Sequence, residues 1–164
     1  MLKPPATGTA ITKKDGRLVV PDDPIIPFIE GDGTGPDIWR ASVRVLDAAV
    51  AKAYGGKRKI AWFEVYAGEK SFKQFNNWLP DDSVEAFRHY LVGIKGPLTT
   101  PVGSGFRSVN VALRKEFELF ANLRPAFTIL PGRYDGIDIV LVRENLEGLY
   151  SGVEHFIQIG GDPR

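Results

Sequence analysis

Short apolar runs and amphipathic stretches alternate along the first half of the chain. The apolar runs predict strands over residues 24–29, 60–66 and 90–94. Between the first two runs, apolar side chains recur at helical spacing, which predicts a helix over residues 36–54 with the inward stripe Trp39, Val43, Leu46, Val50 and Ala53. A shorter helix is expected over residues 80–89. This order is typical of an α/β fold with a parallel-type sheet and flanking helices.

Two further stretches have the pattern of paired strands. Residues 10–20 predict a hairpin with its turn at residues 14–16. Beyond Phe120 the chain is expected to be extended, to turn at residues 131–136 and to continue as a buried strand over residues 137–142.

Glycine-rich segments follow two of the predicted strands. The first is Glu30–Pro36 (EGDGTGP) and the second is Lys95–Gly105 (KGPLTTPVGSG). The carboxyl ends of parallel strands share one edge of a sheet, where ligands bind. The first segment lacks the spacing of a dinucleotide-binding fingerprint because Pro36 interrupts it. A tight strand-to-helix turn is by itself a sufficient explanation of this segment.

A helix beginning near Arg107 has two unlike faces. At about 100° per residue, Arg107, Asn110 and Arg114 fall within an arc of roughly 60°. Opposite them lie Val109, Ala112, Leu113, Phe117 and Phe120. Ser108 stands in the first turn, where free N–H groups attract anions. The polar face suits a multiply charged carboxylate or phosphate, but the spacing fits a solvated helix face just as well.

Composition narrows the class of protein. The chain has 164 residues, of which 43% are hydrophobic and 25% charged, with a net charge of +1. The balanced charge gives nucleic-acid binding little support, and no apolar run reaches membrane-spanning length. With no cysteine and only two distant histidines, no zinc-site pattern is present in the sequence. A cytoplasmic protein is therefore expected.

Several motifs together carry a family resemblance. KGPLTTPVG followed by RSxNxxxR, with EGDGTG, NLRP and RENLEGLYSGVEH, resembles the β-decarboxylating dehydrogenases. Within that family of isocitrate and isopropylmalate dehydrogenases, the pattern is similar to the N-terminal part of the bacterial isocitrate enzymes. The resemblance implies the fold of that family, with residues 1–120 belonging to a large α/β domain. Residues 121–164 would begin a smaller domain and the segment that clasps two subunits.

The resemblance also implies site residues. Isocitrate would be bound by Ser108, Asn110, Arg114, Arg124 and Arg143. Tyr150 would be the general acid, although a tyrosine there is by itself more typical of a core or an interface. The nicotinamide end of the cofactor would contact Thr34, Leu98, Thr100 and Asn110.

The implied reaction is the oxidative decarboxylation of isocitrate to 2-oxoglutarate by a homodimer, with NADP or NAD and Mg²⁺ or Mn²⁺. The family's enzymes are considerably longer, and the catalytic lysine, the metal ligands and the adenosine-binding loop would follow Arg164. Leu146 and Gly148 replace the hydroxyl residue and the acid that are more frequent in the family. Two alternatives stay open: a dehydrogenase for homoisocitrate or isopropylmalate, and a non-catalytic fragment that binds anions or a partner subunit.

Overall fold

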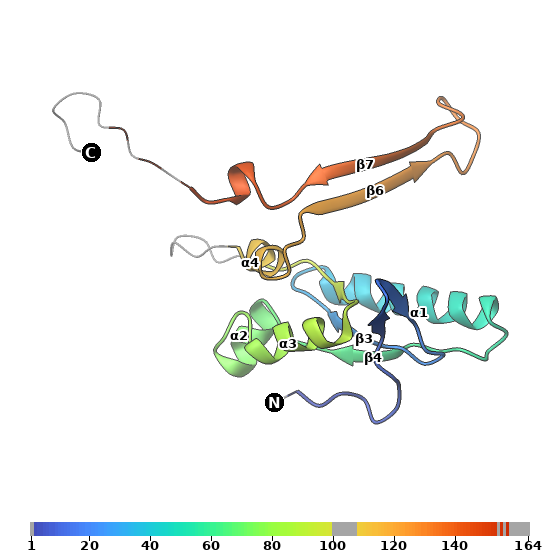
Figure 1. Ribbon diagram of the computed structural model, residues 1–164, viewed down its shortest axis with the longest axis horizontal. Coiled ribbons are helices and arrows are strands. Elements are labelled where there is room, and N and C mark those ends of the chain that lie inside the picture. Colours follow the sequence, from blue (N-terminus) through green and yellow to red (C-terminus); the bar gives the residue numbers. More distant parts are fainter. Residues whose placement is uncertain (1, 100–107, 154, 156, 158–164) are drawn as a thin grey trace. The chain divides into compact units, whose positions relative to one another are not determined.

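The chain divides into two compact units. The computed structural model describes residues 2–99, 108–153, 155 and 157. Unit 1 spans Met1–Asn110 and unit 2 spans Val111–Arg164, so the division precedes the expected domain boundary at residue 120. Figure 1 labels the main helices and strands of both units. No helix in the described part of the chain is long and apolar enough to cross a membrane.

A parallel sheet with flanking helices forms the body of unit 1, as predicted (Figure 1). The strand order is β4-β3-β5. Because the chain crosses from the central strand in one direction and returns in the other, right-handed crossovers put α1 and α3 on opposite faces. The bounds are β3 Ile25–Ile29, α1 Gly35–Ala53, β4 Ala61–Glu64, α2 Glu69–Phe75, α3 Asp81–Tyr90 and β5 Ile94–Lys95.

Aromatic side chains fill both faces of this sheet. On one face Phe28 stacks on Trp39 of α1 with ring centroids 3.9 Å apart, and Trp62 meets both rings edge-on. On the other face Phe63 meets Tyr90 of α3 at 5.8 Å. The sheet therefore has a hydrophobic layer on each side, which is why its strands are nearly continuous apolar runs.

The predicted hairpin near the N-terminus is confirmed, but one strand was misplaced. Thr12–Lys14 (β1) and Arg17–Val19 (β2) pair antiparallel around a turn in which Asp15 and Gly16 both have positive φ. The strand expected over residues 90–94 is wrong. Helix α3 continues to Tyr90, Leu91 ends it at φ 66°, and the strand is confined to β5.

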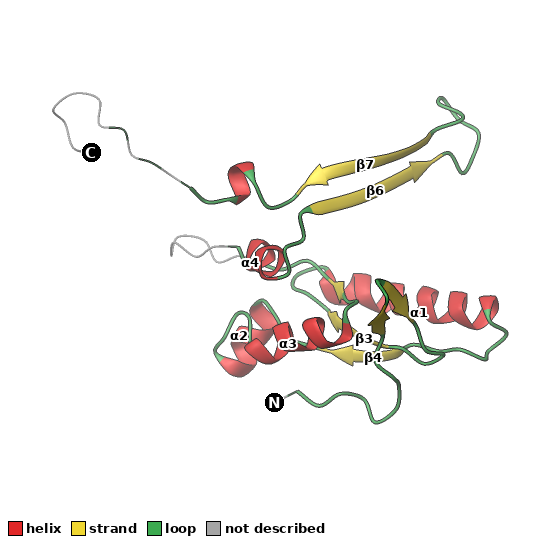
Figure 2. Cartoon of the chain, viewed as in Figure 1, coloured by secondary structure: helices red, strands yellow, loops and turns green. Residues whose placement is uncertain are grey.

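Unit 2 is built on a long two-stranded ribbon (Figure 2). β6 (Ala121–Phe127) pairs antiparallel with β7 (Asp138–Glu144), and the short 3₁₀ helix η1 (Gly148–Tyr150) follows. Helix α4 (Val109–Glu116) precedes the ribbon and spans the division between the units. It ends before Phe120 because Glu118 adopts a left-handed φ of 50°. The expected burial of the last strand is not observed, since Val142 is 64% exposed.

Candidate functional site

Two loops approach each other closely at the carboxyl ends of β3 and β5. The Gly96 amide donates to Ile29 O at 2.7 Å, and the Asp32 amide donates to Pro97 O at 2.7 Å. A Cβ on Gly31 would lie 2.4 Å from Pro97 O, and one on Gly96 would lie 2.0 Å from Glu30 O. Glycine is therefore required at both positions, and the glycine-rich segments form one joined structure.

Asp32 lies buried where these loops meet. Its side chain accepts hydrogen bonds from the Thr99 amide at 2.8 Å and the Glu69 amide at 3.0 Å. The residue is 7% exposed. The sequence argument took the surrounding EGDGTG as a turn and as a family motif, but it assigned no role to Asp32. The available signal was an acid between two glycines after a buried strand, where backbone amides gather.

Three predicted site residues of unit 1 come together around Asn110. Its side-chain amide donates to Leu98 O at 3.3 Å and to the Ser108 hydroxyl at 3.4 Å. The ammonium of Lys95 donates to Asn110 Oδ1 at 2.8 Å and to Gly96 O at 2.7 Å. Lys95 is thus a neighbour of the candidate site that the sequence argument did not assign. Ser108 directly precedes α4, in agreement with its expected place at a helix start.

The remaining residues expected at the cofactor have fewer described contacts. Thr34 is exposed at the N-cap of α1, and its carbonyl accepts from the Ile38 amide at 3.0 Å. Thr100 and Arg107 lie outside the described residues.

Unit 2 places two arginines against one tyrosine. The guanidinium carbons of Arg114 and Arg143 lie 5.5 and 5.6 Å from the centroid of the Tyr150 ring. Arg143 Nη2 also donates to the Tyr150 hydroxyl. All three residues are half-buried. A half-buried pair of cations beside a hydroxyl can bind carboxylates and can stabilise negative charge on the phenol oxygen.

Arg124 occupies the same face of the ribbon as Arg143. Its Nε donates to Asn122 Oδ1 at 3.3 Å, and Asn122 stands directly opposite Arg143 in the strand register. Residues two apart on a strand, and residues opposite each other, point to the same face. Arg124 is exposed and contacts Asn122 rather than Tyr150 in this structure.

A second charged cluster lies at the carboxyl ends of β3 and β4. Lys70 Nζ lies 2.7 Å from Glu30 Oε2 and is also paired with Glu64. Burial of Lys70 opposes its charge, but hydrogen bonds to Glu30 and Glu64 outweigh that cost, and its pKa is raised. This cluster ties α2 to the two strands.

The turn that leads to Tyr150 is organised by Glu144. Its side chain accepts from the Glu147 amide at 2.6 Å and from the Leu146 amide. The bond from Glu147 and then that from Leu146 lower the pKa of Glu144. Leu146, a departure from the family pattern, thus contributes through its backbone, which any residue other than proline would supply.

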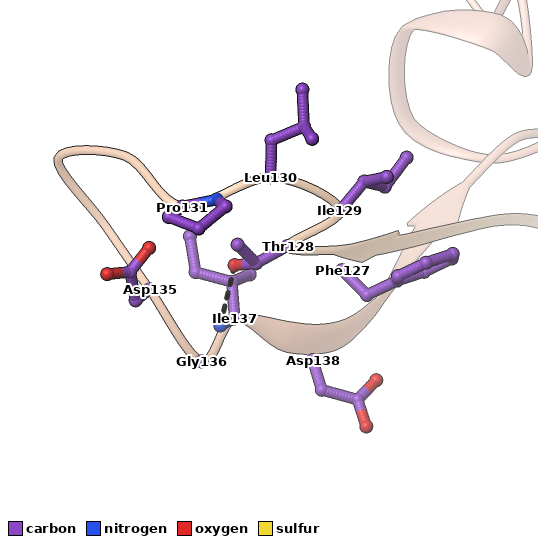
Figure 3. Close-up of a pocket in the computed structure, with 9 residues that line it drawn as sticks. All are labelled: Phe127, Thr128, Ile129, Leu130, Pro131, Asp135, Gly136, Ile137 and Asp138. Atoms are coloured by element: carbon purple, nitrogen blue, oxygen red, sulfur yellow. Dashed lines mark hydrogen bonds between the residues drawn. The ribbon is translucent and has the colours of Figure 1, made fainter.

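The described residues do not form a metal centre of their own. Within ranges 2–99 and 108–153, no three His, Cys, Asp or Glu residues are grouped closely enough to hold a metal ion. A pocket at the tip of the ribbon is shown in Figure 3 and contains none of the predicted site residues. It is lined by Phe127, Thr128, Ile129, Leu130, Pro131, Asp135, Gly136, Ile137 and Asp138.

Comparison with known proteins decides the family. The model of the isocitrate/isopropylmalate dehydrogenase family matches residues 25–163. The chain belongs to this family. A member from Nostoc sp., named isocitrate dehydrogenase [NADP], is 56% identical over 160 residues, covering 93% of this chain and 34% of the relative. The chain thus spans about a third of the length of the curated relatives that it matches.

Two solved structures agree with the fold. An isocitrate dehydrogenase from Methylococcus capsulatus superimposes with a TM-score of 0.67 and 42% identity, covering 82% of this chain and 38% of that one. The TT0538 protein from Thermus thermophilus gives 0.64 and 41%, covering 94% and 30%. The isocitrate/isopropylmalate dehydrogenase-like fold predicted from the motifs is therefore confirmed.

Proposed function

We propose that this chain is the N-terminal part of an NADP-dependent isocitrate dehydrogenase, which converts isocitrate to 2-oxoglutarate and CO₂. The observation that carries the proposal is the cluster in which Arg114 and Arg143 flank Tyr150. Two cations and a hydroxyl suit a substrate that has several carboxylates and that must be protonated during the reaction. The names of the relatives support the same substrate and cofactor.

The substrate-binding residues act by charge and by hydrogen bonding. Arg114, Arg124 and Arg143 bind the carboxylates of isocitrate and hold it in a fixed orientation. Ser108 and Asn110 add neutral hydrogen bonds. These two polar groups disfavour isopropylmalate, because its apolar branch would leave them unpaired.

Tyr150 protonates the product carbon after CO₂ has left. Arg143 already donates to the Tyr150 hydroxyl, and Arg114 lies over the ring. Both cations stabilise the negative charge that remains on the oxygen after the proton has been transferred.

The residues in unit 1 fit the nicotinamide end of the cofactor. Leu98 offers an apolar surface, Asn110 an amide whose nitrogen already contacts Leu98 O, and Thr34 an exposed hydroxyl. Thr100 completes the set proposed from the family motif. The cofactor, when bound, accepts a hydride from the substrate. NADP is favoured over NAD by the names of the relatives.

The proposal also includes a divalent metal and a second subunit. The described residues do not fit a Mg²⁺ or Mn²⁺ centre, so we assign no step to a metal held by this chain. A homodimer is proposed because β6 and β7 expose apolar side chains such as Leu123 and Val140, at 63% and 60%.

The test uses a complete enzyme in which this chain replaces the matched third of the Nostoc isocitrate dehydrogenase, called the Nostoc chimera below. Purified chimera with Mg²⁺ should form NADPH from isocitrate, and turn over homoisocitrate and isopropylmalate far more slowly. The 164-residue chain alone is the control and should show no turnover. A chimera that folds but prefers either other acid would overturn the proposed substrate.

A further inference from the structure

We propose that Asp32 is a positioning residue for the cofactor, and that its carboxylate fixes the segment carrying Leu98 against the glycine turn that leads to Thr34. This inference rests on the proposed function, because it takes Leu98, Thr34 and Asn110 as cofactor contacts. It adds a residue that was not assigned a role by the motifs.

The partners of the Asp32 carboxylate are backbone amides from two distant segments. Oδ2 accepts from the Thr99 amide at 2.8 Å, and Oδ1 accepts from the amides of Glu69 and Lys70 at 3.0 and 3.4 Å. Both oxygens are therefore engaged by the protein itself. With 7% exposure, the side chain is placed to hold loops together rather than to touch a ligand.

The surrounding backbone leaves little room for any other arrangement. A Cβ on Gly68 would lie 2.3 Å from Asp32 Oδ2 and 2.8 Å from Leu98 Cδ2. The Asp32 amide itself donates to Pro97 O at 2.7 Å. The backbone amide and the carboxylate of Asp32 thus hold the Pro97–Thr99 segment at both ends. This pair of contacts is called the grip below.

The grip extends to the proposed cofactor residues through one further bond. Thr99, held by Asp32, follows Leu98, whose carbonyl accepts from the Asn110 side chain at 3.3 Å. Thr34 follows Asp32 by two residues in the same turn. Releasing the Thr99 amide would therefore loosen Leu98 with respect to both Thr34 and Asn110.

Asp32→Ala removes both carboxylate oxygens. The amides of Thr99, Glu69 and Lys70 then lose the acceptor that they share. In the Nostoc chimera we expect the Kd for NADP, measured by calorimetry, to rise about tenfold, while the Kd for isocitrate changes less than about twofold.

A second readout does not depend on activity or on a bound ligand. Hydrogen exchange at the Thr99 amide should accelerate at least about tenfold in the ligand-free Asp32→Ala chimera, because this amide loses its acceptor. Gly68→Ala, which presses a methyl group against Oδ2, should shift both readouts in the same direction. It also serves as the informative variant if Asp32→Ala fails to fold.

Ser83→Ala is the matched control for a purely structural bond. Ser83 is fully buried, and its hydroxyl donates to Tyr66 O at 2.6 Å and accepts from the Tyr66 amide at 3.1 Å. It joins α3 to the segment after β4 and has no described bond to Leu98 or Thr99. Ser83→Ala should lower Tm comparably but leave the Kd for NADP and the exchange of Thr99 close to wild type.

The outcomes separate the two proposals. If Asp32→Ala and Gly68→Ala lower Tm as Ser83→Ala does, yet preserve the Kd for NADP and the exchange of Thr99, Asp32 is structural only and the inference is overturned. If the wild-type chimera itself binds no NADP, the proposed function fails, and this inference fails with it.

Discussion

The two units differ in how many of their apolar side chains are buried. In the described part of the chain, Leu113 is the one buried hydrophobic residue of unit 2, whereas unit 1 buries residues such as Ile29, Phe63 and Val65. The ribbon of unit 2 exposes Phe127 at 65% and Val142 at 64%. A sheet covered by helices on both faces contains its own hydrophobic layers, but an isolated ribbon needs a surface to cover it.

Separating the units is expected to have the largest effect. A polypeptide of residues 1–110 should unfold cooperatively, and all three tryptophans report on it because Trp39, Trp62 and Trp78 lie in unit 1. A polypeptide of residues 111–164 should show no cooperative melt and should bind a hydrophobic dye. Thermal scans of both by circular dichroism and tryptophan fluorescence make the measurement. A sharp melt of the second polypeptide would remove the contrast.

The same substitution in each unit should have very different costs. Phe28 is 9% exposed and stacks on Trp39, so Phe28→Ala should lower the free energy of unfolding by about 3–5 kcal/mol. Phe127→Ala in the 164-residue chain should change the free energy of unfolding by less than about 0.5 kcal/mol, because that ring is already exposed. Urea unfolding followed by circular dichroism compares them.

Phe28→Ala and Phe127→Ala in the Nostoc chimera test whether another part of the enzyme covers the ribbon. If the remainder of the enzyme or a second subunit packs on Phe127, its truncation should now cost clearly more than in the 164-residue chain. An unchanged cost would show that the exposed ribbon face stays exposed in the complete protein.

Local patterns predicted unit 1 well because its elements satisfy their own periodicity. The strand with Phe28 was evident from its apolar run and the helix with Trp39 from its spacing, and the two rings stack. The predicted stripe of the helix is only half-buried, and its last member, Ala53, is exposed. The two-residue strand β5 was misplaced because Tyr90, an aromatic residue typical of strands, ends a helix through the left-handed Leu91. The spacing of apolar residues does not indicate a left-handed helix cap at a residue other than glycine.

The candidate site was predicted less completely, for a physical reason. Asn110, Arg143 and Tyr150 could be named as candidates from the sequence, because they stand in the motifs that resemble the family. Asp32 and Lys95 act through contacts with residues distant in the chain, such as Asp32 with Thr99. Such contacts depend on strand order and loop approach, which a single sequence does not specify.

We expect the carboxylates of the substrate to be bound by arginines of unit 2, the unit whose apolar side chains are mostly exposed. In the Nostoc chimera, Arg143→Ala and Arg124→Ala should each lower kcat/KM for isocitrate at least about tenfold and leave the Kd for NADP near wild type. Steady-state kinetics and calorimetry provide the two numbers. Arg133→Ala is the matched control, because this arginine sits over Tyr134 at the ribbon's tip, with 5.3 Å from its guanidinium to the ring.

The effect of Arg124 sharpens the comparison further. Its side chain is exposed and contacts Asn122 in this structure, unlike Arg143, which already meets Tyr150. We therefore expect the larger loss at Arg143. Wild-type kinetics for Arg124→Ala would remove Arg124 from the site and leave the cluster of Arg114, Arg143 and Tyr150.

The smallest effect is expected for the ion pairs that join α2 to the strands of unit 1. Lys70 is paired with Glu30 and Glu64, and these partners raise its pKa above the ordinary value of 10.5 despite the opposing effect of burial. A raised pKa means that the folded state favours the charged form. The stabilisation is therefore complete below about pH 10.5 and is lost as the pH rises through the folded-state pKa.

Lys70→Met should consequently destabilise the 1–110 polypeptide most at neutral pH and progressively less above pH 10.5. Lys73→Met is the control from the same helix, because Lys73 pairs with Glu69 only at the surface and its loss should cost little. Urea midpoints across the pH range, read by tryptophan emission, give both curves. If the cost of Lys70→Met stayed constant with pH, the ammonium would contribute nothing, and the closure of unit 1 would rest on its apolar layers alone.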